Sequence, residues 1–270
     1  MSLTLELKLE PEVVLEAASL TPENLAYKSY REIAAVKLLY GKETVSLGDF
    51  FTIKGSITDG KVVVAGDLHK VNYLGFRMGQ GTLEIVGEAG KHLGEEMSGG
   101  TVIIHGKAGD FLGARMSGGI IRLYGQAGDY VGSSPVPGQP AMKGGIIYIC
   151  GIAGANVGVS MRRGLILVTG DCGDFLGGEM LGGTVISCGQ VGSWPGGNMR
   201  RGTIILQNKP SLLPTFNYSC TYSPLFLALL RKYLAAWAVP VPSFLKETRF
   251  MRFLGDNNEL GKGEILIPDA

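Results

Sequence analysis

Residues 97–115 read MSGGTVIIHGKAGDFLGAR, and residues 116–134 follow with the closely similar MSGGIIRLYGQAGDYVGSS. The same register extends in both directions, because seven of the nine methionines are separated by 19, 19, 26, 19, 19 and 19 residues. These are Met78, Met97, Met116, Met142, Met161, Met180 and Met199. A fixed period of this length is the signature of a repeat architecture.

Glycine marks the turns of each 19-residue repeat. With each methionine counted as position 0, glycine stands at position 3 of all seven repeats and at positions 9, 12 and 16 of the first six. Of the 42 glycines in the chain, 33 lie between residues 78 and 206. Glycine adopts positive φ and permits close backbone approach, so this distribution predicts the same tight turns in every repeat.

The residues between the glycines follow a strand pattern. Position 5 is always Leu, Val or Ile, and position 7 is apolar in six of the seven repeats. One such repeat cannot bury its apolar face alone, so equivalent strands are expected to stack in parallel. We therefore predict an all-β fold, a right-handed parallel β-helix of about seven 19-residue coils. A left-handed hexapeptide-repeat helix is disfavoured, because the glycine intervals of 6, 3, 4 and 6 residues do not match six-residue faces.

The segments outside the repeats predict caps for the two ends. Residues 57–207 form the predicted β-helix, which begins with a degenerate coil at Ile57. Residues 1–56 predict an N-terminal cap with a short helix from Thr21 to about Tyr30 and a strand over residues 49–55. Residues 208–270 predict a helix over residues 223–238 and a polar tail.

Composition excludes several classes of protein. The net charge of +1 lacks the strong positive charge that is typical of nucleic-acid-binding proteins. The most apolar run, residues 224–239, is too short for a membrane span and contains Arg231 and Lys232. The N-terminus has no signal-peptide pattern. The four cysteines lack CxxC spacing, so we expect reduced thiols in a cytoplasmic protein.

The titratable residues predict no catalytic, cofactor-binding or metal site. None of His69, His92 and His105 has metal-ligand spacing, and His92 falls at position 14, which is aromatic in four other repeats. Aspartate recurs at position 13, where a side chain that bonds nearby backbone N–H groups is the simpler interpretation than a metal ladder.

Two breaks in the repeat pattern are candidate partner-docking elements. Cations at positions 1 and 2 are expected to stack along one edge; they are Lys143, Arg162, Arg163, Arg200 and Arg201. They form either a solvated edge or a docking site for an acidic partner surface or an anionic cofactor group. A seven-residue insertion within Ser133–Pro140, which contains Pro135 and Pro137, predicts a protruding loop that is either a contact element or a neutral excursion.

The glycine coils resemble the C-terminal β-helical domain of the large subunit of glutamate synthase. The flanks make the whole chain similar to the C subunit of formylmethanofuran dehydrogenase. They comprise the Thr-Pro helix, LGDFFTIKG at residues 47–55 and FLGDNNELGKGEILI at residues 253–267.

The resemblance implies a non-catalytic scaffold in an oxidoreductase complex that reduces CO2 to a formyl group on methanofuran, the first step of methanogenesis from CO2. It implies three kinds of partner: a molybdopterin subunit with tungsten or molybdenum and an iron–sulfur cluster, an amidohydrolase-like subunit with metals, and ferredoxin-like subunits. It implies no cofactor in this chain. The alternatives are a glutamate-synthase-like spacer and a free-standing β-helix enzyme, which would need long loops and clustered acids or bases.

Overall fold

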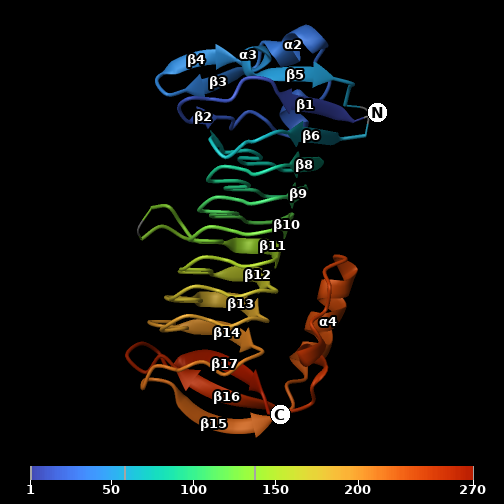
Figure 1. The fold of residues 1–270 in the computed structure, drawn as a ribbon. Helices are drawn as coiled ribbons and strands as arrows, with labels where there is room; N and C mark the ends of the chain where they lie inside the picture. The colour runs from blue at the N-terminus through green and yellow to red at the C-terminus, as the bar shows by residue number, and fades with distance from the viewer. Residues whose placement is uncertain (1, 58, 137, 270) are drawn as a thin grey trace.

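The computed structural model describes residues 2–57, 59–136 and 138–269. Strands dominate it, and they stack into an elongated column (Figure 1). The repeat strands are β6 (Lys61–Ala65), β8 (Thr82–Val86), β9 (Thr101–His105), β10 (Ile120–Tyr124), β11 (Lys143–Cys150), β12 (Arg163–Val168), β13 (Leu181–Ser187) and β14 (Arg201–Leu206). Neighbouring repeat strands are parallel and in the register of the repeat, so that Ile85 pairs with Ile104 and Ile104 with Leu123.

The core runs along the inside of this column. All seven repeat methionines have a relative exposure of 0%. The apolar residues at positions 5 and 7 join them in one continuous cluster. On another side of the column, position 11 forms a second parallel ladder of single bridges: Leu68, Ala89, Ala108, Ala127, Ala153, Cys172 and Val191. Most side chains at this position are small, and they line the core from this second side.

Gly119 shows why position 3 requires glycine. Its φ is +78°, and a Cβ there would lie 2.7 Å from the carbonyl carbon and oxygen of Gly99 in the preceding repeat. Both the left-handed backbone and the close contact exclude larger residues.

Positive φ also occurs at non-glycine residues, which the sequence did not indicate. Within the methionine repeats they stand at position 14 and just before the next methionine; examples are His92, Phe111, Phe175, Arg115 and Glu179.

Position 14 builds an outward stack of rings, as the sequence predicted. The ring centroids of Tyr73 and His92 are 4.6 Å apart, those of His92 and Phe111 5.0 Å, and those of Phe111 and Tyr130 5.1 Å. Adjacent rings lie within 13° of parallel. Stacking between repeats compensates part of the cost of the left-handed backbone that each ring residue adopts.

Position 13 links the repeats by side-chain hydrogen bonds. Asp110 Oδ1 accepts from the Asp129 N–H at 3.0 Å, and Asp129 Oδ1 accepts from the Ala155 N–H at 2.8 Å. Asp174 Oδ1 accepts from the Ser193 N–H at 2.7 Å. The side chains bond backbone N–H groups, as expected, but each reaches the next repeat rather than its own turn.

The N-terminal cap contains more elements than the sequence predicted. They are β1 (Leu3–Leu7), β2 (Leu15–Glu16), α1 (Pro22–Leu25), α2 (Tyr30–Ala34), β3 (Lys37–Tyr40), β4 (Glu43–Ser46), α3 (Leu47–Phe50) and β5 (Phe51–Lys54), with β7 (Val71–Asn72) pairing to β2. Thr21 caps α1 as predicted. The helix nevertheless ends at Leu25 instead of near Tyr30, because Ser29 forms the capping box of a separate helix.

The C-terminal tail was predicted wrongly as a polar extension. Its elements are β15 (Asn217–Tyr222), α4 (Phe226–Ala236), the 3₁₀ turn η1 (Ser243–Lys246), β16 (Phe250–Gly255) and β17 (Lys262–Pro268). β17 pairs in parallel with β14. The 13-stranded sheet therefore has the order β15-β16-β17-β14-β13-β12-β11-β10-β9-β8-β6-β1-β5. Burial of Ile265, Leu266 and Ile267 explains the pairing.

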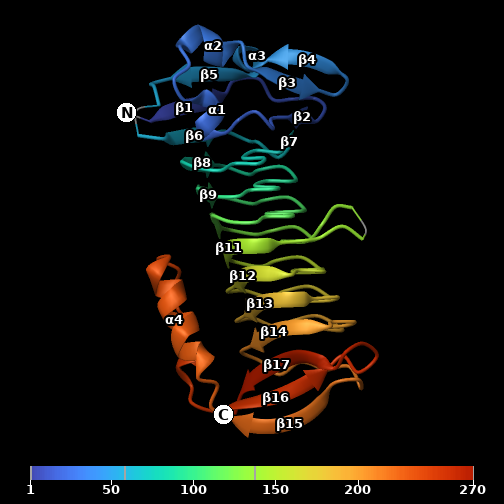
Figure 2. The same ribbon diagram turned by 180° about the vertical axis from the view of Figure 1, so that it is seen from behind.

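Helix α4 packs on the outer face of the repeat strands. Its Leu227 and Leu234 are buried in a second apolar cluster with Tyr148, Leu167 and Ile186, which stand at position 6 of their repeats. Figures 1 and 2 show the helix beside the lower half of the column, on the side opposite the inserted loop. Among the described residues, no helix is long and apolar enough to cross a membrane.

Candidate partner-docking site

The predicted cations come together where the lower repeat strands begin. In the sheet, Lys143 pairs with Arg163, and Arg201 pairs with Leu181 on one side and Lys262 on the other. All four cations are exposed. Four strand steps of about 4.8 Å make the row about 19 Å long. We call these residues, together with Arg162 and Arg200, the basic ridge.

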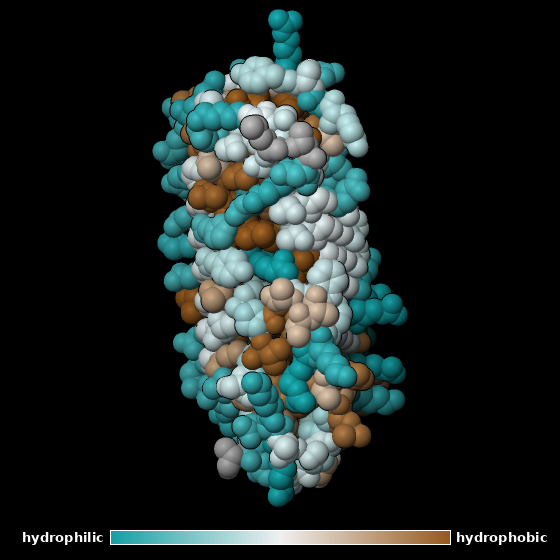
Figure 3. Space-filling model, turned by 90° about the vertical axis from the view of Figure 1, so that its right-hand side faces the viewer, coloured by the Kyte–Doolittle hydropathy of each residue, from teal (hydrophilic) through white to brown (hydrophobic). Residues whose placement is uncertain are grey.

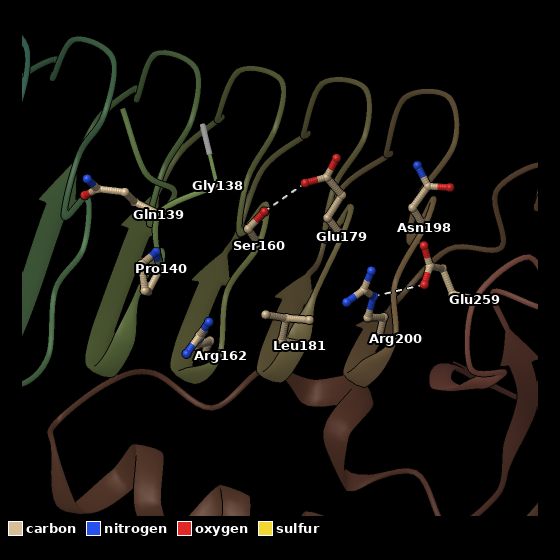
Figure 4. Close-up of a pocket in the computed structure, with 10 residues that line it drawn as sticks. All are labelled: Gly138, Gln139, Pro140, Ser160, Arg162, Glu179, Leu181, Asn198, Arg200 and Glu259. Carbon is tan, nitrogen blue, oxygen red and sulfur yellow. Dashed lines mark hydrogen bonds and ion pairs between the residues drawn. The ribbon is translucent and has the colours of Figure 1, made fainter. Parts of the chain in front are cut away.

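A groove of about 350 Å³ opens beside the ridge (Figure 4). Arg162 and Arg200 line it just before β12 and β14, Leu181 lines it at the start of β13 between them, and Gln139 lines it from the inserted loop. Ser160 Oγ donates to Glu179 Oε2 at 2.9 Å across two neighbouring repeats. The groove is therefore lined mostly by polar groups and offers both hydrogen-bond donors and acceptors.

The ridge retains unneutralised charge. Arg200 Nε donates to Glu259 Oε2 at 2.9 Å, so that this cation is paired. Among the described residues, no ion pair forms at Lys143, Arg162, Arg163, Arg201 or Lys262. Unpaired, exposed cations in one row suit a surface with carboxylate or phosphate groups.

The inserted loop projects from the column, as Figure 1 shows between β10 and β11. Pro135 lines a second hollow of about 480 Å³, between the loop and the ring stack at Phe111 and Tyr130. Pro137 lies outside the described residues. Arg115 Nη1 donates to Gln139 Oε1 at 2.9 Å and ties the loop to the neighbouring repeat.

Arg115 also belongs to a buried charge cluster that the sequence did not reveal. Glu95 is only 3% exposed, and its two oxygens contact His92 Nδ1 at 2.6 Å and Arg115 Nη2 at 3.1 Å. Arg115 contacts Glu96 as well. The partners on both oxygens offset part of the desolvation cost of the buried carboxylate, and the contact with Arg115 links two neighbouring repeats.

The other histidines also lie against carboxylates. His69 Nδ1 is 2.8 Å from Asp67 Oδ1, and His105 Nε2 is 2.9 Å from Glu84 Oε1. The hydrogen bond from Lys61 lowers the pKa of Glu84; burial opposes it, and the bond from His105 adds to it. Within residues 2–57, 59–136 and 138–269, no three His, Cys, Asp or Glu side chains are grouped to hold a metal ion.

The four cysteines are free. Cys150 is exposed and Cys172 is buried, where it lies 3.6 Å from Ser187 Oγ. Burial raises the pKa of the Cys172 thiol to about 12.

No family model matches the sequence. A stretch of 90 residues is 36% identical to the C subunit of tungsten-containing formylmethanofuran dehydrogenase 2 from Methanothermobacter marburgensis, and it covers 32% of this chain and 33% of that protein. A stretch of 86 residues is 35% identical to the C subunit of molybdenum-containing formylmethanofuran dehydrogenase 1 from Methanosarcina barkeri, and it covers 30% of this chain and 29% of that protein. The matched stretch thus spans about a third of these curated relatives.

A solved structure matches the full length. It is a chain of the formyltransferase/hydrolase complex (FhcABCD) from Methylorubrum extorquens, determined in complex with methylofuran. The identity is 32%, the TM-score is 0.93, and the match covers 99% of this chain and 100% of that chain. The chain belongs to the family of formylmethanofuran dehydrogenase C subunits.

In this member of the family, sequence reasoning found all but one cation of the basic ridge. Lys262 was missed because it lies in the tail, outside the methionine period. The signal that could have found it is the run Gly263, Ile265 and Ile267, which matches positions 3, 5 and 7 of a repeat. In the sheet, Gly263 does pair with Gly202, which occupies position 3.

Proposed function

We propose that this chain is a non-catalytic scaffold subunit of a formylmethanofuran dehydrogenase complex in the cytoplasm, which fixes CO2 reductively as N-formylmethanofuran, the first step of methanogenesis from CO2. Tungsten or molybdenum on molybdopterin, and the iron–sulfur clusters, belong to partner subunits in this proposal. An amidohydrolase-like subunit and ferredoxin-like subunits complete the assembly. The full-length match at 32% identity to a chain of a multi-subunit complex is the observation that carries the role in an assembly. The tungsten- and molybdenum-containing relatives support the dehydrogenase as that assembly.

The stacked repeats support a scaffold role by their shape. We interpret the parallel strands and the second ladder of bridges as a right-handed parallel β-helix of seven coils. Its methionines and β-branched residues face inward, and only one insertion departs from the period. A glutamate-synthase-like spacer would share this column, whereas a free-standing β-helix enzyme would need several long loops to gather acids and bases over one face.

The basic ridge is the proposed docking site on this scaffold. Its partner is an acidic protein surface or the anionic group of a cofactor that a partner holds. Lys143, Arg163 and Arg201 supply a row of charges, and Arg162 adds one at the groove. Pro135 and Pro137 belong to the loop that we propose as a second contact element.

A second candidate is the equivalent subunit of a formyltransferase/hydrolase complex. The full-length relative comes from such a complex, whereas the tungsten- and molybdenum-containing relatives match only about a third of their length. In this alternative the chain keeps its scaffold role, but its assembly catalyses formyl transfer and hydrolysis.

Native purification tests the scaffold proposal and separates the two assemblies. The chain, tagged at its C-terminus, is isolated from its own host under anoxic conditions. Co-purification of larger subunits with tungsten or molybdenum, measured by inductively coupled plasma mass spectrometry, supports the dehydrogenase. Larger subunits free of both metals, with formyltransferase activity, support the second candidate. A lone monomer with no associated subunits contradicts the scaffold role.

A charge-reversal pair tests the basic ridge. The variant Arg162→Glu/Arg163→Glu is expected to lose partner subunits during purification, because it places two carboxylates against an acidic surface. Arg31→Glu/Lys42→Glu is the matched control, since both residues are exposed in the N-terminal cap. Unchanged assembly and activity in the first variant would remove the ridge from the proposal.

A further inference from the structure

The outer face of helix α4 is apolar although it is exposed. Leu225 just before the helix is 88% exposed and Leu229 is 70% exposed, and Tyr233 and Trp237 are 45% and 40% exposed. These four residues follow one another at intervals of four, so they form a single apolar stripe along the helix. Figure 3, which views the molecule from the side that carries α4, shows brown hydrophobic residues at the surface among hydrophilic ones.

The opposite face of α4 already packs against the repeat strands, so the exposed apolar stripe is not needed to hold the helix in place. Leu227 and Leu234 bury the inner face against the repeat strands. Arg122 Nη2 donates to the Trp237 carbonyl at 2.6 Å and caps the C-terminal end. Arg231 Nη1 donates to the Leu245 carbonyl at 2.7 Å. The helix therefore presents a fixed, preorganised surface, which lowers the entropic cost of binding a partner.

The charges on α4 favour a different subunit over a second copy of this chain as the partner of the apolar stripe. Residues 224–239 contain two charged side chains, Arg231 and Lys232, and no acid. If a second copy packed its α4 antiparallel on this one, the helix midpoints would meet and the two Lys232 side chains would stand on the same flank of the contact. A nearby acid outside the helix, Glu247, lies beside Leu225 and Ala228, toward the N-terminal end. Helices pack about 8–10 Å apart, so this like-charge contact is unfavourable. The surface instead suits a different partner that carries acids.

We propose that the outer face of α4 docks an amphipathic helix of another subunit, whose apolar stripe meets Leu225, Leu229, Tyr233 and Trp237 and whose flanking Asp or Glu meets Lys232. An apolar stripe with a four-residue repeat fits a second helix that crosses α4 at about 50°. The proposal rests on the proposed function, because it requires an assembly, and it assigns to α4 a contact separate from the basic ridge.

Two variants of the tagged full-length chain test the contact in the native assembly. Leu225→Ser/Leu229→Ser is expected to weaken binding of one partner subunit by about tenfold or more, since these are the two most exposed apolar side chains of the surface. Leu9→Ser/Val13→Ser is the matched control, because these residues are 55% and 48% exposed and lie in the N-terminal cap. Circular dichroism of each isolated chain checks that its melting temperature is unchanged.

Zero-length carbodiimide cross-linking then tests the chemistry of the partner. In the native assembly, Lys232 is expected to join to an Asp or Glu in a helix of another subunit, identified by peptide mass spectrometry. A link from Lys232 to a second copy of this chain, or full retention of every subunit by Leu225→Ser/Leu229→Ser, overturns the proposal. A wild-type chain that purifies alone refutes the scaffold function instead, so the two failures are distinguishable.

Discussion

Replacing Gly119 by alanine tests whether the close approach of repeats, and not only the left-handed backbone, explains the glycine period. The added Cβ would lie 2.7 Å from the carbonyl of Gly99, whereas ordinary van der Waals contact begins at 3.4 Å. The obstructing atoms are backbone, so they cannot rotate away. The two repeats must therefore separate by about 0.7 Å at this point.

The separation has a defined cost. The bond from the Ile120 N–H to the Gly100 carbonyl, at 3.0 Å, and that from the Ser117 N–H to the Met97 carbonyl, at 2.8 Å, join the same repeats at this turn. Lengthening both to the limit of a hydrogen bond costs about 1–3 kcal/mol. Alanine in the left-handed conformation of residue 119 costs about a further 1 kcal/mol. The lower conformational entropy of the unfolded variant offsets about 0.4–1 kcal/mol of the total. We expect Gly119→Ala to lower the free energy of unfolding by about 2–3 kcal/mol.

Gly138→Ala provides the matched control. Gly138 has a φ of +75°, close to that of Gly119, but a Cβ there meets nothing within 4 Å. This variant carries the backbone strain alone, and we expect its stability to lie within about 0.5 kcal/mol of wild type. Urea unfolding of the isolated chains, followed by circular dichroism, measures both. Equal stability of the two variants would refute the argument from close approach.

Three further measurements check other features. Folding lowers the pKa of Glu84, so its carboxylate stabilises the fold above the unfolded pKa of about 4.3, and this effect is lost as the pH falls through the lower folded pKa. Glu84→Gln should therefore lower the free energy of unfolding by about 0.5 kcal/mol at pH 7 and not near pH 2, which melting curves at the two pH values measure. Ellman's reagent at pH 8 should label Cys150 rapidly and Cys172 only after unfolding, and rapid labelling of both would contradict the burial of Cys172. Arg122→Ala should speed amide exchange in α4 about fivefold by uncapping the Trp237 carbonyl, and unchanged exchange mass spectra would show that the cap is dispensable.

The repeat was predictable because every interaction that defines it recurs at a short, fixed separation. Met97 and Met116 mark equivalent places in adjacent repeats, so the period seen in the sequence becomes the register of the sheet. The ring stack followed for the same reason, since His92 and Phe111 share position 14. The basic ridge could be predicted as far as it obeys this period.

The parts that escaped prediction depend on contacts between distant segments or on backbone shape. β17 joins β14 across about 60 residues of chain, and Lys262 enters the ridge only through that pairing. The inner and outer faces of α4 could not be told apart, because Leu227 and Leu229 are the same residue type and only the fold buries one of them. The left-handed conformation of Phe175 had no signal, because such residues ordinarily avoid it.

The pairing of the last strand has a consequence for the order in which the protein forms on the ribosome. Successive repeats are able to stack as they leave the exit tunnel, since each pairs with the one just made. β14 must wait for β17, which spans Lys262–Pro268 at the very end of the described chain. A translation product that stops short of those residues would display an unsatisfied strand edge, open to pairing with any other chain nearby. That edge of the sheet therefore stays open until β17 has been made.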